Sequence, residues 1–144
     1  GLELVVFAHN VECVPRLDST VRDARASFSQ SIGILKKAKQ LRPDILTKSS
    51  IMVGVGETDD EIIQALELLR DAEVDLITIG QYLAPSPNHL PVDRFPEPSQ
   101  YDDWSASLEA MGFLGWACGP LVRSSYKAGE LLAKASARLR TDKE

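Results

Sequence analysis

The segment Arg123-Ser124-Ser125-Tyr126 places a guanidinium group beside two hydroxyl groups, just before a pattern typical of a helix. Two interpretations of it are open. Ser124 or Ser125 can cap the helix by accepting hydrogen bonds from its first amides. Alternatively, a hydroxyl beside an arginine ionises more readily and can bind a hard metal ion. The local pattern does not choose between a helix cap and a metal ligand.

Polar residues also follow three apolar runs that are typical of strands. They are His9-Asn10-Val11-Glu12, Gly54-Val55-Gly56-Glu57-Thr58, and Gln81-Tyr82 with Ser86, Asn88 and His89. In a parallel α/β sheet, ligands bind beyond the carboxyl ends of the strands. These positions are therefore the candidates for a binding site.

Several of these residues also have a plain structural interpretation. Gly54 and Gly56 suit a close approach of ligand to backbone with a helix N-terminus facing an anion, or only a tight strand-to-helix turn. Glu12 beside Asn10 matches the diol of a ribose, or lies on the surface. Lys48 falls within a strand, where a cation is costly unless it faces a ligand or a carboxylate.

The apolar runs alternate with helical patterns along the chain. Strands are predicted over residues 2–8, 45–55, 74–83 and 113–118. Helices are predicted over residues 27–41, 58–70, 100–111 and 127–139. Thr58-Asp59-Asp60-Glu61 reads as a capping box, which marks the start of the second helix. This alternation predicts an α/β fold with parallel strands and right-handed crossovers.

Composition excludes some classes of partner. The formal net charge of −5 on 144 residues provides no chain-wide basic field, so we expect no nucleic-acid partner. The longest apolar run, Leu4 to Ala8, is far too short to cross a bilayer, and we expect neither a membrane partner nor a targeting segment within the chain. Cys13 and Cys118 show no zinc or iron–sulfur ligand spacing. Because an apolar strand begins almost directly after Gly1, we expect further strands to precede it.

Five blocks together resemble the lipoyl synthase family. They are HNVE (9–12), VPRL (14–17), TKSSIMVGVGET (47–58), GQYLAPSPNHLPV (80–92) and GPLVRSSYKAGE (119–130). The resemblance runs along nearly the whole chain and favours the mitochondrial branch of eukaryotes. It implies that residues 1–112 are the C-terminal half of a partial (β/α)₆ radical S-adenosylmethionine barrel. Residues 113–144 would then form a C-terminal extension with the RSSY segment and a terminal helix.

The resemblance also implies an activity. Enzymes of this family are radical S-adenosylmethionine sulfurtransferases that insert two sulfur atoms at C6 and C8 of a protein-bound octanoyl group. They use S-adenosylmethionine and two [4Fe–4S] clusters, one to cleave S-adenosylmethionine and an auxiliary one as the sulfur source. The implied partners are octanoylated lipoyl-acceptor domains, those of 2-oxoacid dehydrogenase E2 and the glycine cleavage H protein, and an electron donor such as ferredoxin. The implied location is the mitochondrial matrix.

Roles for individual residues follow from the matched blocks. The resemblance assigns cofactor binding to Asn10, Glu12, Lys48, Met52, Gly54, Glu57 and Gln81. It assigns an oxygen ligand of the auxiliary cluster to Ser125, with Ser124 as the alternative. Arg123 would be catalytic, holding the anionic form of that serine or the carbonyl of the substrate.

The chain also departs from the family pattern. Neither cysteine triplet of the family, CxxxCxxC nor CxxxxCxxxxxC, is present, so we expect this chain alone to be inactive. Two alternative functions stay open. One is a phosphate-binding (β/α)-barrel lyase or isomerase, with residues 54–58 as the anion cradle and Glu57 as the base. The other is a non-catalytic module that binds a lipoyl-acceptor domain through its proline-rich loop and C-terminal helix.

Overall fold

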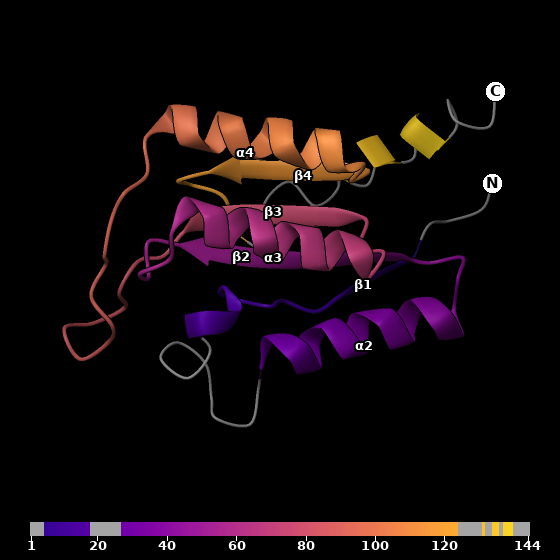
Figure 1. Ribbon diagram of the computed structural model, residues 1–144, viewed down its shortest axis with the longest axis horizontal. Coiled ribbons are helices and arrows are strands. Elements are labelled where there is room, and N and C mark those ends of the chain that lie inside the picture. Colours follow the sequence, from indigo (N-terminus) through magenta and orange to yellow (C-terminus); the bar gives the residue numbers. More distant parts are fainter. Residues whose placement is uncertain (1–4, 18–26, 124–130, 132–133, 136, 140–144) are drawn as a thin grey trace.

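The computed structural model describes residues 5–17, 27–123, 131, 134–135 and 137–139. Its strands form one parallel sheet in the order β1-β2-β3-β4, with β1 at Val6–Ala8, β2 at Leu46–Val53, β3 at Leu76–Gln81 and β4 at Gly115–Gly119. The helices are α2 (Phe28–Leu41), α3 (Asp59–Asp71) and α4 (Pro98–Met111), with a short 3-10 turn at Pro15–Leu17 (Figure 1). The predicted α/β fold with parallel strands is confirmed.

Side-chain caps fix where the first two of these helices begin. Ser27 caps α2 by accepting a hydrogen bond from the Gln30 amide at 3.1 Å. At α3 the Thr58 hydroxyl accepts from the Glu61 amide at 3.2 Å, and the Thr58 amide donates to the Glu61 carboxylate at 2.9 Å. The predicted capping box is therefore confirmed, and it satisfies two amides that have no partner within the helix.

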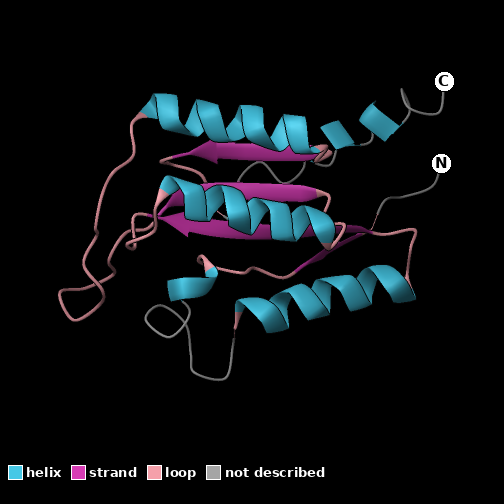
Figure 2. Cartoon of the chain, viewed as in Figure 1, coloured by secondary structure: helices cyan, strands magenta, loops and turns pink. Residues whose placement is uncertain are grey.

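The two faces of the sheet differ, because one is apolar and the other is of mixed polarity. On one face of the sheet, side chains of β2 and β3 pack against α3 and α4 in the main core, and Figure 2 shows these two helices in front of the strands. The core residues are Ile51 and Val53 on β2, Ile77 and Ile79 on β3, Ile62 and Leu66 on α3, and Trp104 and Leu108 on α4. Because side chains alternate along a strand, Lys48, Ser50 and Met52 lie on the opposite, inner face together with Thr78 and Gly80. This inner face carries the polar side chains of Lys48, Ser50 and Thr78 in its middle and the apolar Leu46 and Leu76 at its amino end.

Residues from the end of the chain cover the amino end of the inner face. Residues 131, 134–135 and 137–139 are helical, in agreement with the terminal helix predicted over 127–139, whose other residues lie outside the described part. Ala135 packs in a second core with Leu46 and Leu76. Arg138 stacks over the Trp116 ring at 4.2 Å and donates to the Phe113 carbonyl at 3.0 Å. Figure 1 shows these helical residues, in yellow, beside the amino ends of the strands.

Some predicted strand bounds are wrong. β3 is shorter than the predicted 74–83 because the Val74 amide donates to Leu69 and so closes the end of α3, while Leu83 is half exposed beyond the sheet. β1 begins only at Val6, and residues 2–4 of its predicted range lie outside the described part. β4 pairs with β3, so the sheet continues past residue 112.

Over the described residues, no helix is both long and apolar enough to span a bilayer.

Candidate functional site

A cavity of about 380 Å³ opens at the carboxyl ends of the strands, on the inner face of the sheet. Every strand contributes to it, either by its last residues or by the residues that follow it. The lining residues are Asn10, Glu12, Ser50, Ile51, Met52, Thr78, Gly80, Gln81, Tyr82, Leu83, Pro85, Val122 and Arg123. Its volume lies within the range typical of small-molecule sites. The cavity brings together five of the residues predicted from sequence, Asn10, Glu12, Met52, Gln81 and Arg123.

Glu12 lines this cavity in an uncommon backbone conformation. Its φ is +72°, in the left-handed region that residues other than glycine rarely adopt. Two hydrogen bonds hold it there, because the Glu12 amide donates to Ser50 at 3.1 Å and its carbonyl accepts from Met52 at 2.8 Å. Such strain persists where the surrounding structure enforces it, and it is concentrated at functional sites.

The sheet beneath the cavity carries hydroxyl groups and a buried cation. Ser50 and Thr78 are register partners on β2 and β3, and their hydroxyl groups are hydrogen-bonded to each other. Lys48 lies on the same face two residues before Ser50 and does not line the cavity; it is only 7% exposed. Burial lowers the pKa of its ammonium group. A polar ligand suits this face better than an apolar one.

Glu57 lies outside the cavity, and its carboxylate is bound within the chain. The side chain is 0% exposed. One carboxylate oxygen accepts from the amides of Gly54 at 2.7 Å and Val55 at 3.0 Å, and the other accepts from Arg94 at 2.8 and 3.0 Å. Gly54 has a φ of +95°, and a Cβ atom there would overlap the side-chain amide of Gln81. Both residues therefore shape the loop between β2 and α3.

These contacts bear on the phosphate-binding alternative. The amides of Gly54 and Val55 already donate to Glu57, and the amide of Thr58 donates to Glu61. A carboxylate of the chain itself thus occupies the cradle that a phosphate would need. With Arg94 bound to its second oxygen, Glu57 is also poorly placed to act as a base. The geometry of residues 54–58 counts against this function.

Two arginines that sequence analysis missed hold this loop in place. Arg94 bridges Glu57 and Asp59, the latter at 2.8 Å. Arg16 donates to Glu61 at 2.7 and 2.9 Å and to the carbonyl of Gly56 at 2.7 Å. The hydrogen bond from Arg16 lowers the pKa of Glu61 to about 2. Arg16 lies in the VPRL block and Arg94 in none of the five blocks, and the sequence assigned a role to neither of them.

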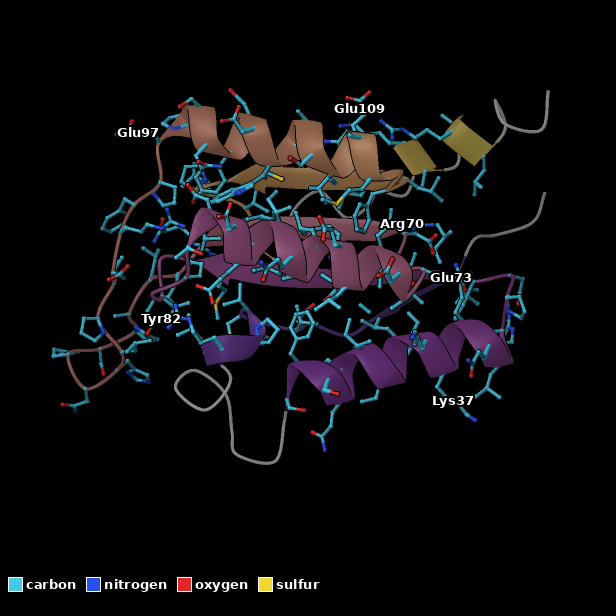
Figure 3. All side chains as sticks on the ribbon, in the orientation of Figure 1. Lys37, Arg70, Glu73, Tyr82, Glu97 and Glu109 are labelled. Carbon is cyan, nitrogen blue, oxygen red and sulfur yellow. The ribbon has the colours of Figure 1, made fainter. Side chains whose placement is uncertain are left out.

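Gln81 and Tyr82 connect the end of β3 to the loop that follows it. The Gln81 side-chain amide donates to the carbonyls of Tyr82 at 2.9 Å and Arg94 at 3.0 Å, and it accepts from the Tyr101 hydroxyl at 3.4 Å. Tyr82 lies at the carboxyl end of the sheet (Figure 3) and donates to the Leu90 carbonyl at 2.7 Å. The polar atoms of the Gln81 side chain thus have partners within the chain, and both residues hold the cavity wall in shape.

The RSSY segment is described only in part. Arg123 lies exposed on the cavity wall, and its guanidinium donates to the Val122 carbonyl at 3.1 Å. Ser124, Ser125 and Tyr126 lie outside the described residues. The serine ligand therefore stays a prediction.

The two cysteines do not suit a metal site. Cys13 is fully buried in the core. Cys118 is the register partner of Ile79, which places it on the helix-covered face, and burial raises the pKa of its thiol to about 11. Thiolates are the form that binds iron, and burial disfavours a thiolate at this position. Among the residues that the structure describes, no three His, Cys, Asp or Glu side chains are grouped to hold a metal ion.

Known proteins similar to this chain are lipoyl synthases, although no protein-family model matches it. Over 131 residues, 91% of the chain, it is 51% identical to the mitochondrial lipoyl synthase of Xenopus laevis and 53% identical to the chloroplastic one of Arabidopsis thaliana. It is 54% identical over 132 residues to the lipoyl synthase of the bacterium Halorhodospira halophila. The chain covers 35%, 33% and 39% of these three proteins, so it spans about a third of their length. The resemblance found in the sequence is confirmed, and these identities do not single out the mitochondrial branch.

Proposed function

This chain is a relative of the lipoyl synthases along nine-tenths of its length, and we propose that it forms the C-terminal third of such an enzyme. The proposed reaction inserts two sulfur atoms at C6 and C8 of an octanoyl group carried on a lipoyl-acceptor domain. When bound, S-adenosylmethionine and two [4Fe–4S] clusters would supply the radical and the sulfur for it.

One observation carries this proposal. Four of the five blocks that resemble lipoyl synthases each contribute residues to a single cavity. Asn10 and Glu12 come from the first block, Met52 from the third, Gln81 from the fourth and Arg123 from the fifth. Residues so far apart in sequence are expected to meet in this way if the blocks together form one binding site.

The chemistry of the lining residues fits S-adenosylmethionine. The carboxylate of Glu12 and the amide oxygen of Asn10 accept hydrogen bonds from hydroxyl and ammonium groups, both of which this cofactor carries. The thioether of Met52 packs against flat apolar surfaces such as a nucleobase. Lys48 would contribute positive potential from deeper on the same face, whereas Gly54, Glu57 and Gln81 would act indirectly by shaping the wall.

Arg123 is the group in this wall suited to the substrate. A guanidinium donates hydrogen bonds and accepts none, so it would hold the amide carbonyl that joins the octanoyl chain to its lysine. Ser125, or Ser124, would supply an oxygen ligand to the auxiliary cluster. The cysteine ligands would come from the remainder of the enzyme, because the two cysteines of this chain are packed in the core on the helix-covered face. An electron donor such as ferredoxin and a location in the mitochondrial matrix belong to the same proposal.

The test is sulfur insertion by the full-length enzyme that contains this chain. The enzyme, reconstituted with iron and sulfide, is incubated with S-adenosylmethionine, a reductant and an octanoylated acceptor domain, and the intact mass of the domain is measured. We expect a mass gain corresponding to two sulfur atoms. Arg123→Ala should lower the yield, while Arg42→Ala, which changes an exposed arginine on a surface ion pair, should not. No sulfur insertion by the wild-type enzyme would refute the proposal.

A further inference from the structure

The backbone of the chain after β4 comes close to the inner face of the sheet at Gly80 and at Gly115. A Cβ atom added to Gly80 on β3 would overlap the carbonyl oxygen of Val122 and lie 3.1 Å from its carbonyl carbon. A Cβ atom added to Gly115 on β4 would lie 2.9 Å from the Leu76 side chain and 3.0 Å from the carbonyl oxygen of Leu131. At both points a backbone carbonyl of the later segment packs against the backbone of the sheet, and a side chain on the sheet would prevent this contact.

The contact at Gly80 involves a carbonyl that also binds Arg123. The amide of Val122 donates to Gly119 at 3.2 Å, which closes the turn after β4, and Val122 is buried. Its carbonyl oxygen points at Gly80 and accepts the hydrogen bond from the Arg123 guanidinium at 3.1 Å. A single oxygen atom thus connects the surface of β3 to the arginine on the cavity wall.

We propose that Gly80 is a positioning residue for Arg123. Without a side chain, Gly80 lets the Val122 carbonyl lie against β3, and that carbonyl orients the guanidinium at the cavity. The inference rests on the proposed function, in which Arg123 holds the carbonyl of the octanoyl-lysine substrate. It adds to that function a residue in the sheet that determines how firmly the substrate is held.

Gly119 provides a matched control. It is the register partner of Gly80 on the neighbouring strand and faces the same valine. A Cβ atom on Gly119 would meet only a methyl group of Val122, at the ordinary contact distance of 3.6 Å. Gly119→Ala should therefore be accommodated, whereas Gly80→Ala must displace the Val122 carbonyl. The two variants make the same chemical change on the same face and differ in whether they disturb this oxygen.

The experiment uses the full-length enzyme and an octanoyl-lysyl peptide as the probe. Equilibrium binding is measured for wild type, Gly80→Ala, Arg123→Ala and the double variant, with Gly119→Ala as the control. Loss of a hydrogen bond to a charged donor predicts roughly tenfold weaker binding for each of the two single variants. If Gly80 acts through Arg123, the double variant binds no more weakly than the weaker single one. Wild-type affinity for Gly80→Ala, or additive losses in the double variant, would overturn the inference.

Hydrogen exchange of the Val122 amide provides a second readout that does not depend on the substrate. This amide should exchange faster in Gly80→Ala and at the wild-type rate in Gly119→Ala, and unchanged exchange in Gly80→Ala would count against the inference. If wild-type enzyme does not bind the peptide, the proposed function fails, and exchange alone decides the role of Gly80. Should Gly80→Ala fail to fold, Val122→Ala replaces it in the cycle with Arg123→Ala, because it removes the buried side chain that holds the Val122 backbone beside Gly80 and Gly119. Additive losses there would also reject the inference.

Discussion

Removing Arg94 should destabilise the protein because it leaves the Glu57 carboxylate buried with only part of its bonding. In Arg94→Met, Glu57 keeps the amides of Gly54 and Val55 but loses two hydrogen bonds from a charged donor, of 2.8 and 3.0 Å. Breaking a buried ion pair costs about 3–5 kcal/mol when neither partner can reach water. The Arg94 side chain is 30% exposed, so water can partly replace it, and we expect about 2–3 kcal/mol.

The assay is urea denaturation of the full-length enzyme, with the slope of the unfolding free energy against urea checked for constancy. Arg42→Met is the matched control, because Arg42 pairs with Asp44 on the surface, where both side chains are more than half exposed, and no measurable change is expected. In the double variant Arg94→Met/Glu57→Gln no uncompensated charge remains, so it should be more stable than the sum of the two single losses predicts. If Arg94→Met were as stable as wild type within about 0.5 kcal/mol, the ion pair between Arg94 and Glu57 would not stabilise the fold.

Three further predictions concern titration, thiol chemistry and the chain by itself. The pKa of Glu61 is lowered from 4.5 to about 2, so its contribution to stability is present above pH 4.5 and is lost as the pH falls towards 2. In acid unfolding followed by circular dichroism, the advantage of wild type over Glu61→Gln should disappear across this range, and an advantage that persists at pH 2 would contradict the Arg16 contact. Because the pKa of Cys118 is raised to about 11, only about one thiol in 1,000 is ionised at pH 8. Iodoacetamide should therefore label Cys118 far more slowly in folded than in urea-unfolded protein, and equal labelling rates would refute the burial of this thiol. The 144-residue chain alone should give no sulfur insertion by mass spectrometry, and detected product would contradict its dependence on cysteines from elsewhere. Titrating the same chain with an octanoylated acceptor domain tests the non-catalytic alternative, which a measured affinity would favour.

Local signals were sufficient to predict most of the fold. The capping box at Thr58 and Glu61 depends on residues three positions apart, so it can be read from sequence and is present in the structure. The polar residues after each apolar run were expected to meet because parallel strands end at one edge of a sheet. Asn10, Glu12, Gln81 and Tyr82 do line one cavity, whereas residues 54–58 lie outside it.

Contacts between distant residues could not be predicted in the same way. Glu57 was assigned to cofactor binding from its motif, but Arg94, 37 positions later, binds its carboxylate, and no pattern in the sequence pairs the two. The left-handed backbone of Glu12 likewise depends on hydrogen bonds to Ser50 and Met52 on β2. Sequence alone identified the strand ends that form the cavity, and only tertiary contacts determine which polar groups remain available to a ligand.

Binding of S-adenosylmethionine to Glu12→Gln in the full-length enzyme tests most directly whether this cavity holds the cofactor. Calorimetric titration is compared with wild type and with Glu67→Gln, the same change at an exposed position on α3. Loss of a hydrogen bond to a charged acceptor is worth about 1.5–3 kcal/mol, so we expect the Kd of Glu12→Gln to rise by roughly 10-fold to 150-fold and that of Glu67→Gln to stay at the wild-type value. A wild-type Kd for Glu12→Gln would contradict the assignment of the cavity to S-adenosylmethionine.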